Sequence, residues 1–308
     1  MATLRLKQER LGPLRRREAR AGLLFTLPWL ISLLVFTAYP VLGTFSLAFT
    51  EYAIVDTPRW IGLDNFRTMF QDDPAFWTAV RNSAIYAGLS VPLRLGLALG
   101  LAMLLNLGIR GIGIYRALFY LPSLVPPIAA TLVFVQMFSP DYGPIDAAFQ
   151  AVGLPTIDWF DDPSWSKVAL VILSLWSLGV ETLVFLAGLK DVPSDLIEAA
   201  QLDGASRWRR FMDVTVPMIT PVILFNLVIG VIGSFQVFSQ AVAVGGTTGE
   251  PLESTLMFMV LIYRNAFSYF AMGYAAALAV VLFLSVLMVT LVIFRSARVW
   301  VYYEGSQR

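Results

Sequence analysis

One short polar stretch, from Glu198 to Pro217, lies between two long apolar segments of the chain. Its skeleton is Glu-Ala-Ala, three residues, Gly204, nine residues and then Val-x-Val-Pro. Ala199 and Ala200 are small, so no bulky side chain there would hold a partner surface away. With small residues in its middle and charged residues at its ends, the stretch is suited to docking into a cleft of another protein. Such docking is non-covalent binding and not catalysis.

Local signals predict two short helices in this stretch. Ser194 is a candidate N-cap of the first helix, and Asp195 and Glu198 in its first turn suit the positive end of the helix dipole. Gly204 suits a left-handed stop that a side chain would resist. A second helical stretch follows, and Pro217 marks the start of the next long helix, where a missing N–H is tolerated.

Covalent catalysis and metal binding have little support in the composition. The chain contains no Cys and no His, which removes thiolates, disulfides and the commonest general base and metal ligand. It contains no G-x-x-x-x-G-K-[ST] phosphate loop, so it cannot itself supply an ATPase. We therefore expect no catalytic residue, no metal site and no cofactor in this chain.

The elements that position the polar stretch are predicted to be membrane-spanning helices. Hydrophobic residues make up 57% of the chain and charged residues 14%, whereas soluble domains carry about 25% charged residues. A bilayer core about 30 Å thick requires about 20 apolar residues in a helix. Apolar runs of that length predict an all-α polytopic membrane protein with about six transmembrane helices, near residues 21–43, 84–107, 117–138, 168–189, 216–243 and 270–294.

The orientation follows from where basic residues gather. Most of the 22 Lys and Arg residues lie in segments that are inside if the N-terminus is inside, and positive charge marks the cytoplasmic side. Both termini are therefore predicted to be cytoplasmic, and the basic start is interpreted as an inside anchor, not a nucleic-acid site. The expected parts are a basic segment 1–20, a six-span domain 21–294 with a cytoplasmic loop 190–213, and a tail 295–308.

Several motifs together resemble a known family. The polar stretch, with Glu198, Ala199, Ala200, Asp203, Gly204 and Pro217 at matching spacing, resembles the Glu-Ala-Ala loop of permease subunits of bacterial ABC importers. Further segments look like those of maltose- and glycerol-phosphate-type carbohydrate permeases: Leu27–Pro28, Tyr39–Pro40, Phe45–Thr50, Trp60–Phe66, Arg116–Pro122, Pro126–Pro127, Leu186–Leu189 and Met272–Ala277. The resemblance covers nearly the whole chain.

The resemblance implies an ABC type I importer permease fold in the bacterial inner membrane. It also implies a heterodimer with a second, related permease, two ATPase subunits that bind ATP and magnesium, and an extracytoplasmic sugar-binding protein. The Glu198 stretch would then be the coupling loop that docks onto an ATPase subunit. A simple connector between two spans is the alternative interpretation of that stretch.

Two charged residues fall inside predicted spans, where charge is costly and usually faces a cavity or a partner. Glu181, close to Trp176 in the fourth span, could accept hydrogen bonds from sugar hydroxyls. It could equally pair with a cation on the partner permease or lie near the inner mouth. Arg94 in the second span is interpreted as structural, because it could snorkel or pair with Glu181.

The fifth span contains polar residues that suit a sugar path. Asn226 lies in its first half, and Gln236 and Gln240 are four residues apart, so they are expected to share a helix face with Ser239 beside it. Polar contact between helices is the alternative explanation. The family often has Asp where this chain has Ser239, and Gly245–Pro251 replaces its usual Gly-Gly-Pro turn. The resemblance therefore does not predict the details of the outer gate or of the substrate contacts.

An ion-coupled secondary transporter is the rival from a different class, because such proteins use intramembrane carboxylates and broken helices. The absence of His and the single mid-span acid argue against it. Within the ABC interpretation, glycerol phosphate or another solute is the alternative substrate. A phosphate group would require several Arg or Lys residues facing a cavity, and Arg94 is the one basic residue within the predicted spans. A neutral di- or oligosaccharide therefore agrees better with the sequence as a substrate.

Overall fold

The computed structural model describes residues 13–108 and 110–302, without the side chains of residues 13–16, 19 and 20. Over this range the chain is mostly helical. Two short strands, β1 (Thr50–Glu51) and β2 (Arg59–Trp60), pair as an antiparallel hairpin. The α-helices are α1 (Pro13–Leu33), α2 (Tyr39–Leu47), α3 (Asp64–Gln71), α4 (Pro74–Leu105), α5 (Ile112–Tyr120), α6 (Pro127–Met137), α7 (Pro144–Ala151), α8 (Ser166–Ser174), α9 (Gly179–Lys190), α10 (Ser194–Leu202), α11 (Arg207–Arg210), α12 (Val216–Phe235), α13 (Ser239–Gly245), α14 (Phe258–Tyr263) and α15 (Met272–Trp300). Shorter π or 3-10 segments are η1 (Leu34–Ala38), η2 (Leu121–Leu124), η3 (Leu175–Ser177), η4 (Phe211–Thr215) and η5 (Arg264–Ser268).

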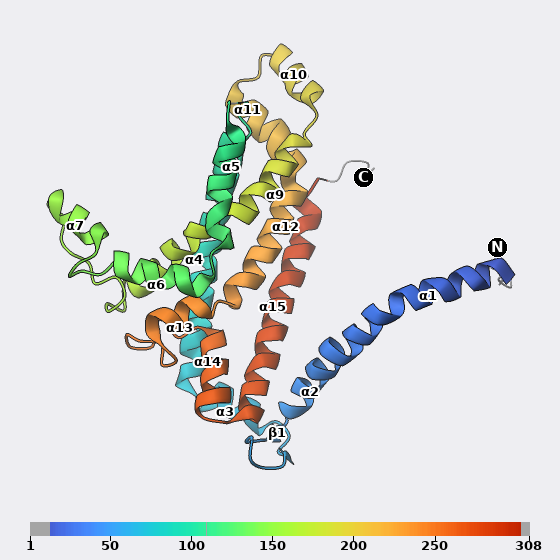
Figure 1. Ribbon diagram of the computed structural model, residues 1–308, viewed down its shortest axis with the longest axis vertical. Coiled ribbons are helices and arrows are strands. Elements are labelled where there is room, and N and C mark those ends of the chain that lie inside the picture. Colours follow the sequence, from blue (N-terminus) through green and yellow to red (C-terminus); the bar gives the residue numbers. More distant parts are fainter. Residues whose placement is uncertain (1–12, 109, 303–308) are drawn as a thin grey trace.

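The six predicted spans correspond to four long helical segments and two bent pairs among the described residues. The long segments cover Ala21–Leu47, Pro74–Leu105, Arg207–Gly245, which is interrupted between Phe235 and Ser239, and Met272–Trp300. The third and fourth spans, predicted as single helices, are each broken, with bends of 96° after Leu124 and 52° after Ser177. Each of these two spans is therefore a bent pair of helices, and α6 turns sideways from the bundle (Figure 1).

The two breaks differ in what surrounds them. Pro126 and Pro127 follow the first half of the third span, and Val125 and Pro126 are extended at ψ 130° and 132°, as expected before a proline. The break in the fourth span contains no proline. There Gly179 lies so close to the end of α5 that an added Cβ would be 2.8 Å from the Cα of Tyr120.

Two π segments precede prolines and have one cause. The backbone N–H of Tyr39 bonds to the carbonyl of Leu34, and that of Val216 bonds to the carbonyl of Phe211, both five residues earlier. In each case the next residue is a proline, which lacks an N–H and whose ring would clash with the carbonyl four residues back. The wider π turn accommodates the ring while the helix continues.

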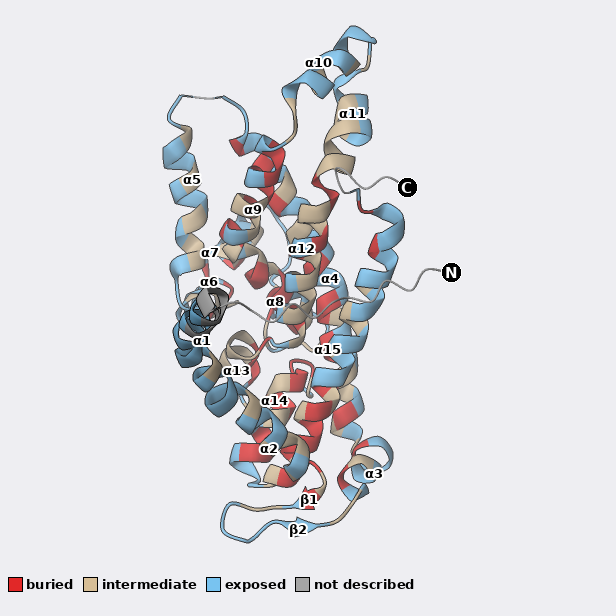
Figure 2. Cartoon of the chain, turned by 90° about the vertical axis from the view of Figure 1, so that its right-hand side faces the viewer, coloured by how far each residue is buried: buried red, intermediate tan, exposed pale blue. Residues whose placement is uncertain are grey.

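The buried core has a larger outer part and a smaller part near α10. The outer part joins α4, α14 and α15 through residues such as Phe76, Val260 and Leu278. The second part joins α4, α9 and α12 through Ala102 and Phe185 with neighbours on α12. Figure 2 shows these buried faces in red, with α10 and the hairpin at opposite exposed ends.

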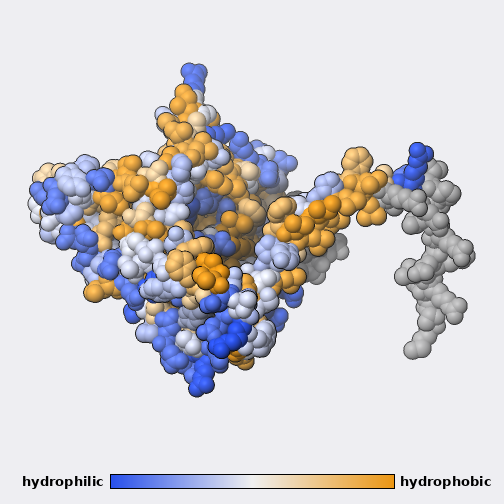
Figure 3. Space-filling model, turned by 60° about the horizontal axis from the view of Figure 1, so that its bottom comes forward, coloured by the Kyte–Doolittle hydropathy of each residue, from blue (hydrophilic) through white to orange (hydrophobic). Residues whose placement is uncertain are grey.

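The first span leaves the bundle. Its end, α2, packs on α15, where the rings of Phe45 and Phe283 lie 6.0 Å apart edge to face. From there α1 points away (Figure 1), and none of its most apolar 18-residue window is buried. Figure 3 shows this arm as a largely apolar projection that the rest of the chain does not cover.

Several helices extend beyond the predicted limits of the spans. Helix α1 begins at Pro13, so the last residues of the segment 1–20 continue into the first span. Helix α4 begins at Pro74, ten residues before the predicted 84, and α15 extends past 294 to Trp300. Residues 1–12 and 303–308 of the predicted termini lie outside the described residues.

Candidate functional site

The predicted coupling stretch is a short helix closed by a glycine. Helix α10 ends at Leu202, and Gly204 follows in the left-handed region at φ +79°. The N–H of Ala205 bonds to the carbonyl of Ala200 at 2.9 Å, and the N–H of Gly204 bonds to the carbonyl of Gln201 at 3.1 Å. This pair of bonds is a Schellman motif, so the predicted role of Gly204 as a left-handed stop is confirmed.

The start of α10 differs from the prediction. Pro193 occupies the N-cap with no side-chain bond, Ser194 is the first helical residue, and of the two acids only Asp195 lies in the first turn. Glu198 lies in the middle of the helix and is exposed. Extended geometry at Pro193, with ψ 127°, starts the helix without a side-chain cap.

The predicted coupling stretch projects beyond the bundle (Figure 1). Leu202 is 90% exposed and Trp208 66% exposed, which is unusual for large apolar residues without a partner. Glu198, Ala199 and Asp203 are exposed as well. The stretch is therefore shaped as a surface knob.

The knob is joined rigidly to the fifth span. Ser206 caps α11 by accepting a hydrogen bond from the N–H of Arg209 at 3.3 Å, and Arg210 bonds to the side chain of Gln201 at 2.5 Å. Helix α11 continues through η4 into α12, where Pro217 lies in the first turn as predicted. A force on the knob therefore acts on one continuous helix that ends near the middle of the molecule.

Two cavities of about 470 and 460 Å³ lie at that end, each within the ~300–1,000 Å³ typical of ligand pockets. We call them the polar chamber and the apolar chamber. The polar chamber is lined by residues that include Tyr86, Ser90, Ser174, Ser234, Gln236, Phe238 and Ser239. The apolar chamber is lined by residues that include Leu173, Trp176, Val180, Val184, Phe225 and Asn226. Their shared wall consists of Arg94, Pro127, Ser177, Glu181, Ile229 and Gln240.

All six predicted path residues line one or both chambers. Glu181 and Gln240 belong to the shared wall. Trp176 and Asn226 line the apolar chamber, and Gln236 and Ser239 line the polar one. The structure thus brings together residues from the fourth and fifth spans, and their contact with a sugar stays a prediction.

The reason given for grouping Gln236 with Gln240 is wrong. Helix α12 ends at Phe235, Gln236 is its C-cap, and α13 starts only at Ser239, so no continuous helix face joins the two glutamines. Phe238 lies in the break at φ −134° and ψ −62°. The unwound segment, not helical periodicity, turns these polar side chains toward the polar chamber.

Arg94 pairs with Glu181 of the same chain. Its Nε donates to Glu181 Oε1 at 3.2 Å and its Nη2 donates to the carbonyl of Ser177 at 3.0 Å, while Nη1 bonds to the carbonyl of Ser174. The two side chains are only 20% and 18% exposed. Arg94 thus satisfies carbonyls freed at the break in the fourth span and holds Glu181 at the start of α9.

Asn226 is a buried donor without a partner. The residue is 3% exposed, and its Nδ2 makes no hydrogen bond within the described residues. Such a group costs free energy unless a partner from outside the described residues satisfies it. Ser90 and Tyr86 also line the polar chamber and were not predicted, although Tyr86, Ser90 and Arg94 recur every four residues on α4.

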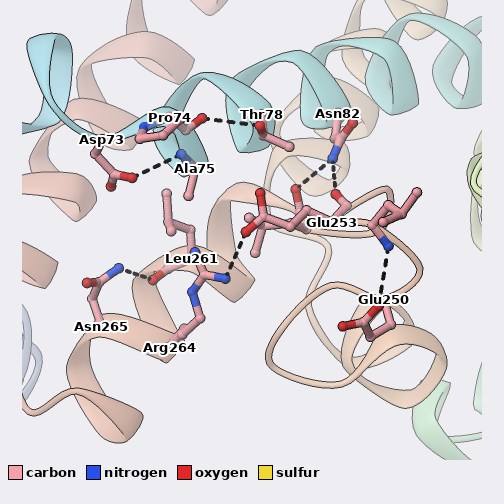
Figure 4. A network of polar contacts seen from close by, with 12 residues as sticks. Asp73, Pro74, Ala75, Thr78, Asn82, Glu250, Glu253, Leu261, Arg264 and Asn265 are labelled. Carbon is pink, nitrogen blue, oxygen red and sulfur yellow. Dashed lines mark hydrogen bonds and ion pairs between the residues drawn. The ribbon is translucent and has the colours of Figure 1, made fainter.

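The outer loop between α13 and α14 is fastened to α4, as Figure 4 shows. The side-chain amide of Asn82 donates to the carbonyls of Glu253 and Leu256 at 2.8 and 3.2 Å. Arg264, whose side chain is 10% exposed, pairs with Glu253 at 3.3 Å. These contacts hold in place the segment where the chain departs from the family's usual turn.

Comparison with known proteins gives consistent results. The chain is 40% identical to the probable ABC transporter permease protein YesP of Bacillus subtilis strain 168, over 95% of each chain. It is 33% identical to the lactose transport system permease protein LacF of Rhizobium radiobacter, over 90% of this chain and 94% of that one. A crystal structure of a bacterial alginate ABC transporter, in complex with an alginate pentasaccharide-bound periplasmic protein, matches with a TM-score of 0.81 at 25% identity, covering 93% of this chain and 98% of that chain.

These matches confirm the sequence-based resemblance to carbohydrate ABC permeases and the importer permease fold. They also confirm a multi-pass membrane component of a transporter, not an enzyme. The profile of the family described as "binding-protein-dependent transport system inner membrane component" matches residues 93–298, which include the knob, the lining of the apolar chamber and the lining of the polar chamber except Tyr86 and Ser90. The chain therefore belongs to the family of binding-protein-dependent transport system inner membrane components.

Proposed function

We propose that this chain is one permease half of an ATP-driven importer for a neutral di- or oligosaccharide. The observation that carries the proposal is the pair of adjoining chambers, which combine hydroxyl-bonding and aromatic side chains at the end of the helix that bears the knob. The relatives support a sugar, since LacF is named for lactose transport and an alginate transporter of similar structure is described as importing an acidic polysaccharide.

The lining of the chambers suits an uncharged, hydroxyl-rich solute. Gln236, Ser239 and Gln240 offer donors and acceptors, and Trp176 and Phe225 offer apolar faces for a sugar ring. Arg94 is the sole cation on either chamber wall among the described residues, and it is already paired. A phosphate-bearing solute such as glycerol phosphate would meet no free cation there.

The coupling step is proposed to take place at the knob formed by α10 and α11. Two separate ATPase subunits would bind ATP and magnesium, and one of them would receive Glu198, Ala199 and Ala200 in a cleft. Closure of the ATPase pair would pull the knob and bias the bundle toward one of its two states. The rigid Schellman turn at Gly204 and the continuous helix into α12 support transmission of that movement.

The second permease is proposed to cover the arm formed by α1 and η1. Phe25 and Phe36 are 87% and 77% exposed on this arm, which the rest of the chain leaves bare. A related permease lying beside α2 and α15 would bury part of that apolar surface. A sugar-binding protein would dock at the opposite end from the knob, near the hairpin and α3, and both termini would be cytoplasmic.

Uptake by a reconstituted complex tests the path. Vesicles would contain this chain, its sister permease and the ATPase, with the binding protein and a panel of labelled disaccharides outside. Glu181→Ala and Gln236→Ala are expected to lower uptake at least about tenfold, the effect of one or two lost hydrogen bonds, while leaving complex assembly intact. Unchanged uptake kinetics in both variants would reject these chambers as the sugar path.

A further inference from the structure

The shared wall of the chambers carries a compensated pair of charges. Arg94 and Glu181 are the two charged residues on the walls of both chambers, within the part of the chain that the structure describes. Each side chain retains about a fifth of its surface exposed, so the pair faces the chambers and is not sealed away. A solute passing between the chambers therefore moves along a path whose local net charge is zero.

Arg94 and Glu181 differ in the number of their hydrogen-bond partners. Arg94 is also bound to the carbonyls of Ser174 and Ser177, so it has partners besides Glu181. The carboxylate of Glu181 has Arg94 as its bonded partner among the described contacts. Loss of the Glu181 charge would leave Arg94 in place as an uncompensated cation facing both chambers.

We infer that Glu181 is a specificity-determining residue that keeps Arg94 neutralised and thereby disfavours sugars that carry carboxylates. A uronic acid entering the path competes with Glu181 for one guanidinium, and it meets the Glu181 carboxylate as a like charge. A neutral sugar meets neither penalty. The inference rests on the proposed sugar path, and it adds the charge class of the substrate and the residue that sets it.

Equilibrium binding to the permease complex in nanodiscs tests the inference. The binding protein is omitted, because it selects sugars before they reach the path. The probes are digalacturonic acid and galactobiose, which differ in their carboxylates, and the measured quantity is the ratio of their dissociation constants. Glu181→Gln keeps the size of the side chain and an oxygen that accepts from Arg94, and it should shift the ratio toward digalacturonic acid by about tenfold.

Substitution of the other member of the pair, Arg94, should reverse the charge preference. Arg94→Gln leaves Glu181 as the uncompensated charge, so preference should move toward diglucosamine, which carries amines. The double variant Arg94→Gln/Glu181→Gln should return to the wild-type preference, although its overall affinity can fall. A purely structural role would weaken all three sugars together and leave the ratios unchanged, and that result would overturn the inference.

Two further variants complete the design. Glu51→Gln removes one member of the exposed Arg59–Glu51 pair of the hairpin, remote from the chambers, and should leave every ratio unchanged. Gln240→Lys adds a cation to the shared wall without altering the ion pair, and should favour digalacturonic acid even if variants of the pair fail to assemble. If the ratio of dissociation constants is unchanged in both Gln240→Lys and Glu181→Gln, the inference is contradicted. If the wild-type complex takes up no sugar in the vesicle experiment, the proposed function is contradicted instead.

Discussion

At the residue scale, buried polar groups in a membrane protein serve either folding or binding, and their partners tell the two apart. Asn265 is buried, and its amide donates to the carbonyl of Leu261 at 2.9 Å. Asn226 is equally buried, and its Nδ2 has no bonded partner within the described residues. The first arrangement stabilises the fold, whereas the second is costly unless a ligand completes it.

We expect Asn226→Leu to separate stability from binding. Removal of the unsatisfied amide should leave the thermal unfolding midpoint of the detergent-solubilised complex unchanged or raised, because an orphan donor costs about 1–3 kcal/mol. Sugar affinity should fall by about tenfold if the amide bonds to the substrate. Both quantities can be measured on one preparation.

The matched control is Asn265→Leu, which removes a satisfied amide outside the chambers. It should lower the unfolding midpoint and leave sugar affinity intact. An Asn226→Leu complex that is less stable and binds sugar normally would show that Asn226 belongs to the fold.

At the level of the elements, irregular segments of the helices line the chambers and close the knob, and the sequence reveals only some of them. Gly204 was predictable because a left-handed helix stop favours glycine strongly. The bend after Leu124 has the visible cause Pro126–Pro127. The break at Leu175–Ser177 has no local signal, since it depends on Arg94, 80 residues earlier, to bond the carbonyl of Ser174.

The same limit applies to the fifth span. Its apolar run reads as one helix from 216 to 243, and the interruption at Gln236–Phe238 is not marked by proline or glycine. The sequence still singled out polar residues that line the chambers, because polar side chains within a span are costly and therefore informative. Their arrangement was not predictable, since it arises from packing between distant segments.

A second prediction concerns the π segment before α12, which sets how the knob is rotated relative to the chambers. Pro217→Ala restores an N–H and removes the ring clash that the π segment Phe211–Thr215 accommodates. If the segment returns to α-helical bonding, the knob should rotate by about 100°, the turn of one residue. We expect fewer sugars imported per ATP hydrolysed, with normal assembly.

Pro221→Ala is the matched control, because it lies inside α12 and follows no π segment. It should leave the number of sugars imported per ATP unchanged. An unchanged ratio in Pro217→Ala as well would mean that the register of this helix does not set coupling.

For the molecule as a whole, the proposed topology has the two exposed ends on opposite sides of the membrane. Val55 in the hairpin loop is 95% exposed and Leu202 in the knob is 90% exposed, at opposite ends of the bundle (Figure 2). The chain contains no Cys, so a single introduced Cys is the one thiol of this chain. A membrane-impermeant maleimide should label Val55→Cys in intact cells and Leu202→Cys only after permeabilisation. The reverse labelling pattern would invert the orientation proposed from the basic residues.

Coupling between ATP hydrolysis and sugar uptake through the knob can be tested in a single reconstituted system. ATP hydrolysis and labelled-sugar uptake would be recorded in the same vesicles for wild type, Gly204→Pro and Gly111→Pro. Both glycines have positive φ, +79° and +81°, and a Cβ added at either would meet no neighbouring atom within 4 Å, so proline is equally incompatible with each backbone. We predict that Gly204→Pro assembles but loses sugar uptake and its sugar-stimulated hydrolysis, while Gly111→Pro retains both. Normal coupled uptake by Gly204→Pro, or uptake by this chain alone under an ion gradient, would contradict the account.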